Sequence, residues 1–178
     1  AVLIMDPFEV KTGLDNLTLV IDTREQETDL LRRRIALVGL PHTRQKLDFG
    51  DYSGYTTLND GTEFTLTDKV AIERKMSLGE LCQCYCQGRA RFTREFERAR
   101  AVNAKLYLLI EGANWENVIT GRYRSKMSPQ ALRASIMAWL ARYDCQLIFC
   151  KAESTPILIH DILYRELKER LEVANEQS

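Results

Sequence analysis

The end of one short apolar stretch carries the residues best suited to chemistry. Residues 70–72 predict a buried strand, and the charged residues Glu73, Arg74 and Lys75 follow it directly. Side chains alternate along a strand, so Glu73 and Lys75 are expected on the same side. A carboxylate that binds a divalent cation and a lysine that orients a water together suit phosphodiester cleavage. A solvated strand end with a surface ion pair is the alternative, and this short pattern alone favours that alternative.

Two further acidic residues follow predicted structure upstream. Asp22 ends an apolar strand over residues 17–21, and Asp51 follows Gly50 at the close of a turn-like segment. Mg²⁺ is a hard cation that takes oxygen ligands, and convergent carboxylates at strand ends would supply them. We assign Asp51 and Glu73 as direct metal ligands, and Asp22 as a ligand or a second-metal residue.

The neighbouring charged residues have supporting roles in this hypothesis. The backbone carbonyl of Arg74 is a further candidate ligand, and its side chain either clamps phosphate or pairs with an acid. Lys75 orients the water or stabilises charge in the transition state. Arg24 and Glu25 form either an ion pair that shapes the site or a plain salt bridge.

The order of these motifs resembles a known family. Asp-x-Arg-Glu at 22–25, Gly-Asp-Tyr at 50–52, Ile-Glu-Arg-Lys at 72–75 and Gly88-Arg89 are similar to the nuclease domain of the XPF/Mus-type structure-specific endonucleases. The resemblance runs from about Leu17 to Gly112. It implies a restriction-endonuclease-like fold, dependence on Mg²⁺ or Mn²⁺, and cleavage of branched or flap-like DNA in repair or recombination. It also implies a dimer.

The chain departs from the family pattern in two places. Gly79 occupies the position four residues after Lys75 where the family has an aspartate, and Glu80 follows as a candidate substitute. No helix-hairpin-helix module is expected after Cys150, because no glycine occurs there. The chain therefore resembles a compact stand-alone version, as in bacteria or phages. A catalytically impaired DNA-binding module and an interaction subunit of a nuclease complex remain the alternative functions.

Length and composition favour one soluble domain over residues 1–178. Hydrophobic residues make up 45% and charged residues 28% of the 178-residue chain. Residues 1–16 show no clear periodicity and are open to interpretation as an N-terminal arm. No apolar run approaches the roughly 20 residues of a membrane span, so no membrane partner is expected. The five cysteines lack zinc spacing and are expected to be reduced, which favours the cytoplasm.

Charge is balanced in total but uneven along the chain. The 25 basic and 25 acidic residues sum to a net charge of zero. Local basic segments can still bind phosphates. The candidates for DNA contact are Arg89, Arg91, Arg122, Arg124 and Lys126; solvated helix faces are the alternative.

Strand and helix patterns alternate along the chain. This alternation predicts an α/β layered domain with a central mixed sheet flanked by helices. Strands are expected at 17–22, 43–47, 52–58, 62–66, 69–74, 105–110 and 146–150. Helices are expected at 27–38, 77–103 with a break at Gly88, 116–119, 128–143 and 155–173.

The last predicted helix carries a broad apolar stripe. Part of the stripe must cover the chain's own sheet, and one interpretation is that all of it does. Its width favours shared use with a second copy, so a homodimer is predicted. The stripe residues are Leu158, Ile159, Ile162, Leu163, Leu167 and Leu171.

Overall fold

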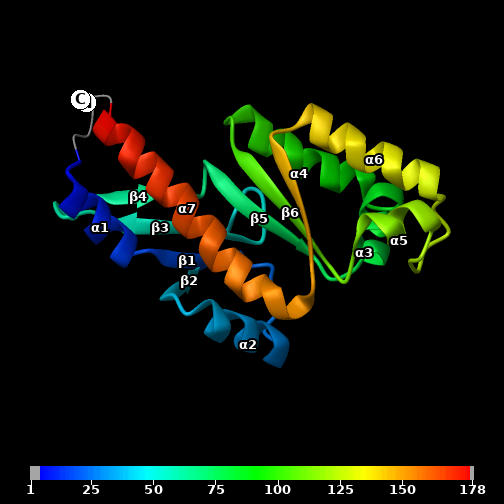
Figure 1. Ribbon diagram of the computed structural model, residues 1–178, viewed down its shortest axis with the longest axis horizontal. Helices are drawn as coiled ribbons and strands as arrows, with labels where there is room; N and C mark the ends of the chain where they lie inside the picture. Colours follow the sequence, from blue (N-terminus) through cyan, green and yellow to red (C-terminus); the bar gives the residue numbers. More distant parts are fainter. Residues whose placement is uncertain (1–4, 177–178) are drawn as a thin grey trace. The chain divides into compact units, whose positions relative to one another are not determined.

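The computed structural model describes residues 5–176, with side chains described for residues 5–173. It divides into two compact units that interleave along the sequence. Unit 1 comprises Ala1–Leu47, Tyr52–Thr67 and Pro156–Ser178, and unit 2 comprises Asp48–Asp51 and Asp68–Thr155. Figure 1 labels the elements of both. That residues 1–178 form one domain stays a prediction.

Unit 1 contains four short strands. β1 (Thr18–Ile21) pairs in parallel with β2 (His42–Arg44) and antiparallel with β3 (Tyr52–Thr57). β3 pairs antiparallel with β4 (Glu63–Thr65), and the turn between them holds Gly61 at φ 82°, as a tight hairpin turn requires. The predicted hairpin is therefore confirmed. β2 ends at Arg44 and does not extend to Leu47 as predicted.

Two helices of unit 1 have defined caps. α2 (Asp29–Val38) begins after the Thr28 cap, ends at left-handed Gly39, and buries Leu31, Ile35 and Val38. The sequence analysis did not predict α1 (Pro7–Asp15), which lies within the proposed arm. Asp6 and Glu9 form a capping box there, each side chain accepting from the other residue's N–H at 2.8 Å. Residues 1–4 lie outside the described residues.

The apolar stripe of α7 (Thr155–Glu176) is buried within this single chain. Ile159, Leu163, Leu167 and Leu171 are fully buried, and Ile162 is 9% exposed. A Cβ built on Gly54 would lie 3.9 Å from Leu163 Cδ1, and one on Gly13 would lie 2.8 Å from Leu171 Cδ1. The stripe therefore covers unit 1's own strands and α1, so its width gives no support to a homodimer.

Unit 2 is built on three parallel strands. β5 (Val70–Lys75) pairs with β6 (Lys105–Glu111), which pairs with β7 (Cys145–Cys150). Their central residues are apolar because helices cover them. The register places Glu73 opposite Leu108 and Lys75 opposite Ile110. The end of β5 therefore lies beside the end of β6, where Ile110 is the next-to-last residue.

The helices of unit 2 pack around an aromatic core. The predicted break at Gly88 is confirmed, because it separates α3 (Leu78–Cys86) from α4 (Arg89–Ala101). α5 (Trp115–Thr120) and α6 (Pro129–Arg142) follow β6, and a 3₁₀ turn (Ala152–Ser154) follows β7. α4 and α6 run side by side (Figure 1), with the Phe92 and Trp139 rings stacked 5.7 Å apart. The core shared by these helices and strands includes Leu81, Phe96, Leu106, Leu108 and Ile136.

The predicted fold class is confirmed. The strands pair both in parallel and antiparallel, and helices alternate with them along the chain. These features define an α/β fold with a mixed sheet and flanking helices. Within residues 5–176, no helix is long and apolar enough to cross a bilayer.

Candidate active site

Strand β5 presents Glu73 and Lys75 on one face, as the alternation of side chains predicted. Glu73 is 4% exposed and Lys75 is 8% exposed, so neither is a solvated strand end. Lys75 Nζ donates to Glu73 Oε1 at 2.9 Å and lies 5.2 Å from the centre of the Phe92 ring. This face is the one on which α3, α4 and α6 pack, because Ala71, two residues before Glu73, belongs to their core. The pair is therefore buried between strand and helices.

Asp51 lies beside the end of β5. Its N–H donates to the Ile72 carbonyl at 2.8 Å, and its Oδ2 accepts from the Arg74 N–H at 2.7 Å. Gly50 precedes it at φ 80°, and a Cβ there would lie 2.5 Å from the Ala71 Cβ. Only glycine permits this approach, because it has no side chain and adopts positive φ readily. The structure thus brings Asp51 to the same strand end as Glu73.

A third carboxylate at this corner was missed by the sequence analysis. Glu95 lies on α4, and its Oε1 accepts from the Gly50 N–H at 2.7 Å. In the sequence Glu95 stands among arginines and was considered only as a surface partner of Arg89. Its position on the same helix face as Phe92, three residues earlier, was the one available signal.

Burial and like charges raise the pKa of Glu73 well above its usual value. Removal from water is the largest cause, and the negative charges of Asp51 and Glu95 add to it, while Lys75 acts in the opposite direction. The Oε2 atom of Glu73 is buried and has no hydrogen-bond partner while the carboxyl group is ionised; when protonated, the carboxyl group shares a side-chain hydrogen bond with Glu95. A buried carboxylate oxygen without a partner is costly, so this atom lies ready for a ligand.

Lys75 stays charged in this environment. Burial alone would lower the pKa of its ammonium group, but the negative charges of Glu73 and Asp51 raise it above the ordinary value. Lys75 is therefore a donor and a fixed positive charge, and it cannot act as a general base at neutral pH.

The side chain of Arg74 points to the opposite face of β5 and pairs with an acid. Its Nε and Nη2 atoms donate to Glu111 at 3.0 and 2.7 Å. Thr155 Oγ1 also donates to Glu111, at 2.5 Å. Of the two predicted roles for Arg74, the structure shows pairing with an acid, and Glu111 is the partner that the sequence analysis did not identify.

Asp22 belongs to unit 1 and is held there by local contacts. It is 1% exposed; its Oδ1 accepts from the Leu47 N–H at 2.9 Å and its Oδ2 from Arg24 Nε at 2.5 Å. Arg24 thus pairs with Asp22, a partner not foreseen. Glu25 uses its backbone carbonyl to accept from Arg44 at 2.7 Å. The catalytic role of Asp22 stays a prediction.

Gly79 and Glu80 lie at the start of α3. A Cβ built on Gly79 would lie 2.9 Å from the Arg124 carbonyl oxygen, so the backbone there fills the space that an aspartate would need. Glu80 caps the helix start, since its Oε2 accepts from the Met76 N–H at 2.8 Å and its own N–H donates to Ser77 at 3.1 Å. The structure therefore gives Glu80 a capping role, and its supporting role in the site stays a prediction.

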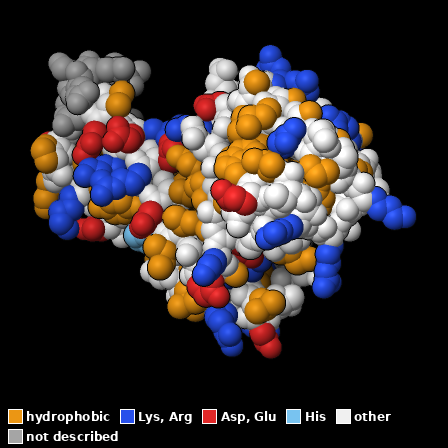
Figure 2. Space-filling view, turned by 45° about the vertical axis from the view of Figure 1, so that its right-hand side comes forward, with side chains coloured by type: hydrophobic (Ala, Val, Ile, Leu, Met, Phe, Trp, Pro, Cys, Tyr) orange, Lys and Arg blue, Asp and Glu red, His pale blue; other side chains and the backbone are white. Residues whose placement is uncertain are grey.

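The candidate DNA-contact residues of unit 2 are exposed. Arg122, Arg124 and Lys126 lie between α5 and α6, and Arg89 and Arg91 lie in the first turn of α4. The Arg89 guanidinium is 5.4 Å from the centre of the Trp139 ring, which restricts its position. Among the described residues on the face drawn in Figure 2, basic and acidic side chains are interspersed and form no continuous basic strip.

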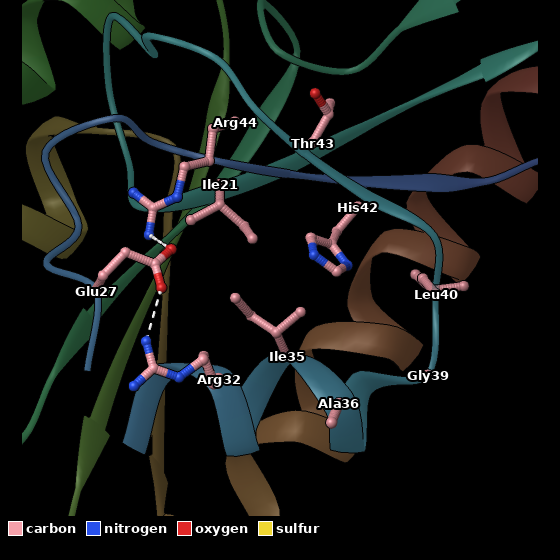
Figure 3. Close-up of a pocket in the computed structure, with 10 residues that line it drawn as sticks. All are labelled: Ile21, Glu27, Arg32, Ile35, Ala36, Gly39, Leu40, His42, Thr43 and Arg44. Atoms are coloured by element: carbon pink, nitrogen blue, oxygen red, sulfur yellow. Dashed lines mark hydrogen bonds and ion pairs between the residues drawn. The ribbon is translucent and has the colours of Figure 1, made fainter. Parts of the chain in front are cut away.

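Unit 1 contains a separate pocket of about 690 Å³ between α2 and β2. Figure 3 shows Glu27 at one end, where it pairs with Arg44 at 2.6 Å and Arg32 at 3.1 Å. Arg32 also pairs with Asp29 at 2.5 Å, so these charges balance and leave no excess for an anion. None of the ten described residues that line this pocket belongs to the predicted metal site.

Comparisons with known proteins agree with this fold. The model of the ERCC4 domain matches residues 21–159. Among solved structures, XPF from Aeropyrum pernix has a TM-score of 0.55 at 19% identity over 84% of this chain and 61% of that chain. XPF from Aeropyrum pernix in complex with DNA has a TM-score of 0.56 at 21% identity over 86% and 66%. The chain thus spans under two thirds of these relatives' length. No curated protein matches.

Proposed function

Because the chain belongs to the ERCC4 domain family, with the fold of an XPF-type nuclease domain, we propose that it is a metal-dependent DNA endonuclease. The observation that carries this proposal is the buried Glu73 carboxylate with its unpartnered Oε2 atom, beside Lys75 and Asp51. A buried carboxylate oxygen without a partner needs an explanation, and a bound cation would supply one.

The donor set fits a divalent cation. As the described residues stand, no three His, Cys, Asp or Glu side chains are close enough to hold a metal ion. Carboxylate oxygens are nevertheless the ligands that Mg²⁺ and Mn²⁺ prefer, and the crowding of Asp51 and Glu95 around Glu73 leaves excess negative charge for a cation to offset. Asp51, Glu73 and the Arg74 carbonyl would hold the metal, and the predicted role of Asp22 is that of a separate, second-metal residue.

The chain's own residues would then divide the remaining work of hydrolysis. A bound cation supplies an activated water and offsets charge on the phosphate. Asp51 is held in place by the Arg74 N–H. Lys75 remains protonated and donates a hydrogen bond, so it orients the water or stabilises the negative charge of the transition state.

The first experiment measures cleavage. The purified chain is incubated with labelled flap, fork, junction and linear duplex DNA in Mg²⁺ or Mn²⁺, beside the variant Asp51→Asn. We expect metal-dependent cutting of the branched substrates, as in repair or recombination, and none by the variant. Cation and DNA binding without cutting would instead identify a catalytically impaired binding module. Gly79 motivates this alternative, because it stands where the family has an aspartate.

Contacts to DNA are part of this proposal. The exposed residues Arg122, Arg124 and Lys126 are the best candidates, with Arg89 and Arg91 as further ones. Each phosphate contact contributes a slope near 0.9 per charge to the salt dependence of binding to duplex DNA. Neutralising the first three residues together should flatten that slope, and an unaltered slope would assign them to the solvated surface.

The proposal includes two further features, an oligomeric state and a location. A homodimer rests on the family resemblance, since the α7 stripe is buried in the single chain. A particle of about 20 kDa in sedimentation, with protein still active, would exclude the dimer as a requirement. A cytoplasmic location is supported by five free cysteines, and cell fractionation tests it.

A further inference from the structure

We propose that Glu95 is a positioning residue that tunes the candidate metal site. It acts through two neighbours: it holds the Gly50–Asp51 corner, and it adds a third negative charge beside Glu73. This inference rests on the proposed function and assigns a role to a residue outside the motifs that carry the family resemblance.

The first support is the hydrogen bond from Gly50. Glu95 Oε1 accepts from the Gly50 N–H at 2.7 Å, so a charged acceptor on α4 fixes the peptide that directly precedes Asp51. Gly50 cannot be fixed by its own side chain. Asp51 is in turn tied to β5 through the Ile72 carbonyl and the Arg74 N–H. A rigid helix thus helps to set the position of a proposed metal ligand.

The second support is the unpartnered Oε2 atom of Glu73. It is buried in a residue that is 4% exposed, and it is the atom that a ligand must satisfy. The Glu73 carboxyl group interacts with the charges of Asp51 and Glu95, and Glu95 also shares a side-chain hydrogen bond with it. A cation that binds Glu73 therefore benefits from Glu95 even without direct contact.

Packing of α4 does not require a carboxylate at this position. The helix is anchored by Phe92, Phe96 and Ala99, which are buried in the core of unit 2. Like charges that crowd a buried carboxylate reduce stability, so an acid kept here favours function over stability. Removing the charge of Glu95 should therefore weaken cation binding, but it should leave the stability of the metal-free protein unchanged or higher.

The test uses Glu95→Gln, which retains an oxygen that can accept from the Gly50 N–H but removes the charge. Titration with Mn²⁺ alone in a calorimeter should show affinity weakened by about 10- to 100-fold, as for other residues that support metal ligands. In metal-free buffer the melting temperature should be unchanged or higher. The matched control is Glu97→Gln on the same helix, because Glu97 accepts from Tyr143 at 2.7 Å instead. This control should bind Mn²⁺ as the wild type does.

The possible results separate this inference from the proposed function. Wild-type protein that binds no Mn²⁺ would overturn both. Wild-type binding together with unchanged affinity in Glu95→Gln would overturn the role of Glu95 alone. A Glu95→Gln variant that loses affinity only because it melts earlier would show a structural residue and would also contradict the proposal.

Discussion

The two faces of β5 carry ion pairs that differ in how completely they are satisfied. On one face, Arg74 makes two hydrogen bonds to Glu111, and Thr155 adds a third. On the other, Lys75 reaches one oxygen of Glu73, and the second oxygen has no partner. Adjacent residues of one strand thus form a closed structural pair and an open site. In β5, the charged strand end is a candidate for chemistry on the face where a buried acceptor is left available.

The largest expected effect comes from removing one carboxylate on each face. Glu73→Gln should reduce DNA cleavage at least about 1,000-fold, because it removes a metal ligand, without lowering the melting temperature. Glu111→Gln should instead destabilise the protein by about 2–4 kcal/mol, because Arg74 loses its charged partner. Cleavage assays measure the loss of activity expected for one variant, and denaturant unfolding measures the loss of stability expected for the other. Equal losses of activity and stability in the two variants would contradict the proposed difference between the two faces of β5.

A substitution of Lys75 separates cation binding from catalytic turnover on the Glu73 face of β5. Lys75→Met retains the length of the side chain but removes its charge. We expect turnover to fall by about 10²- to 10³-fold, since a preorganised donor is lost. Affinity for Mn²⁺ should be retained or tightened, because Glu73 no longer shares its oxygen with an ammonium group. Normal turnover in this variant would remove Lys75 from the mechanism.

Gly79 tests how closely the backbone at Arg124 packs on the start of α3. A methyl group in Gly79→Ala would lie 2.9 Å from the Arg124 carbonyl oxygen, so the backbone there must move. We expect a loss of about 1–3 kcal/mol in unfolding free energy, as for other overpacked sites. Gly88→Ala is the control, since its Cβ would have no neighbour nearer than 3.6 Å. An equally stable Gly79→Ala variant would show that this position tolerates a side chain.

The smallest expected effect is a pH dependence of stability in metal-free protein. The folded state raises the pKa of Glu73 above its ordinary value of 4.5, so it keeps a proton that the unfolded chain has released. Stability from this group is therefore complete below about pH 4.5 and is lost as pH rises through the raised value. Glu73→Gln should be more stable than wild type at pH 8, and this advantage should vanish towards pH 4.5. Thermal melts in chelator at several pH values measure it; a constant difference would contradict the raised pKa.

Features that depend on neighbours in the chain could be predicted from the residues alone. The period of two along a strand places Glu73 and Lys75 on one side, and Gly61 and Gly88 mark a hairpin and a helix break. The same reasoning did not find α1, whose nine residues lack a clear apolar period. Local geometry is set within a few residues, which is why these patterns can be read directly.

The tertiary structure alone decided which distant residues complete the site. Glu95 and Gly50 are 45 residues apart, and Arg74 and Glu111 are 37 apart. The packing of the 121–128 backbone on Gly79 and the burial of the α7 stripe in unit 1 are likewise long-range outcomes. Many acids and arginines in the sequence were equally available as partners. Only the packing of helices onto strands brings particular side chains together, because burial and hydrogen-bond geometry act across the fold and leave no local pattern.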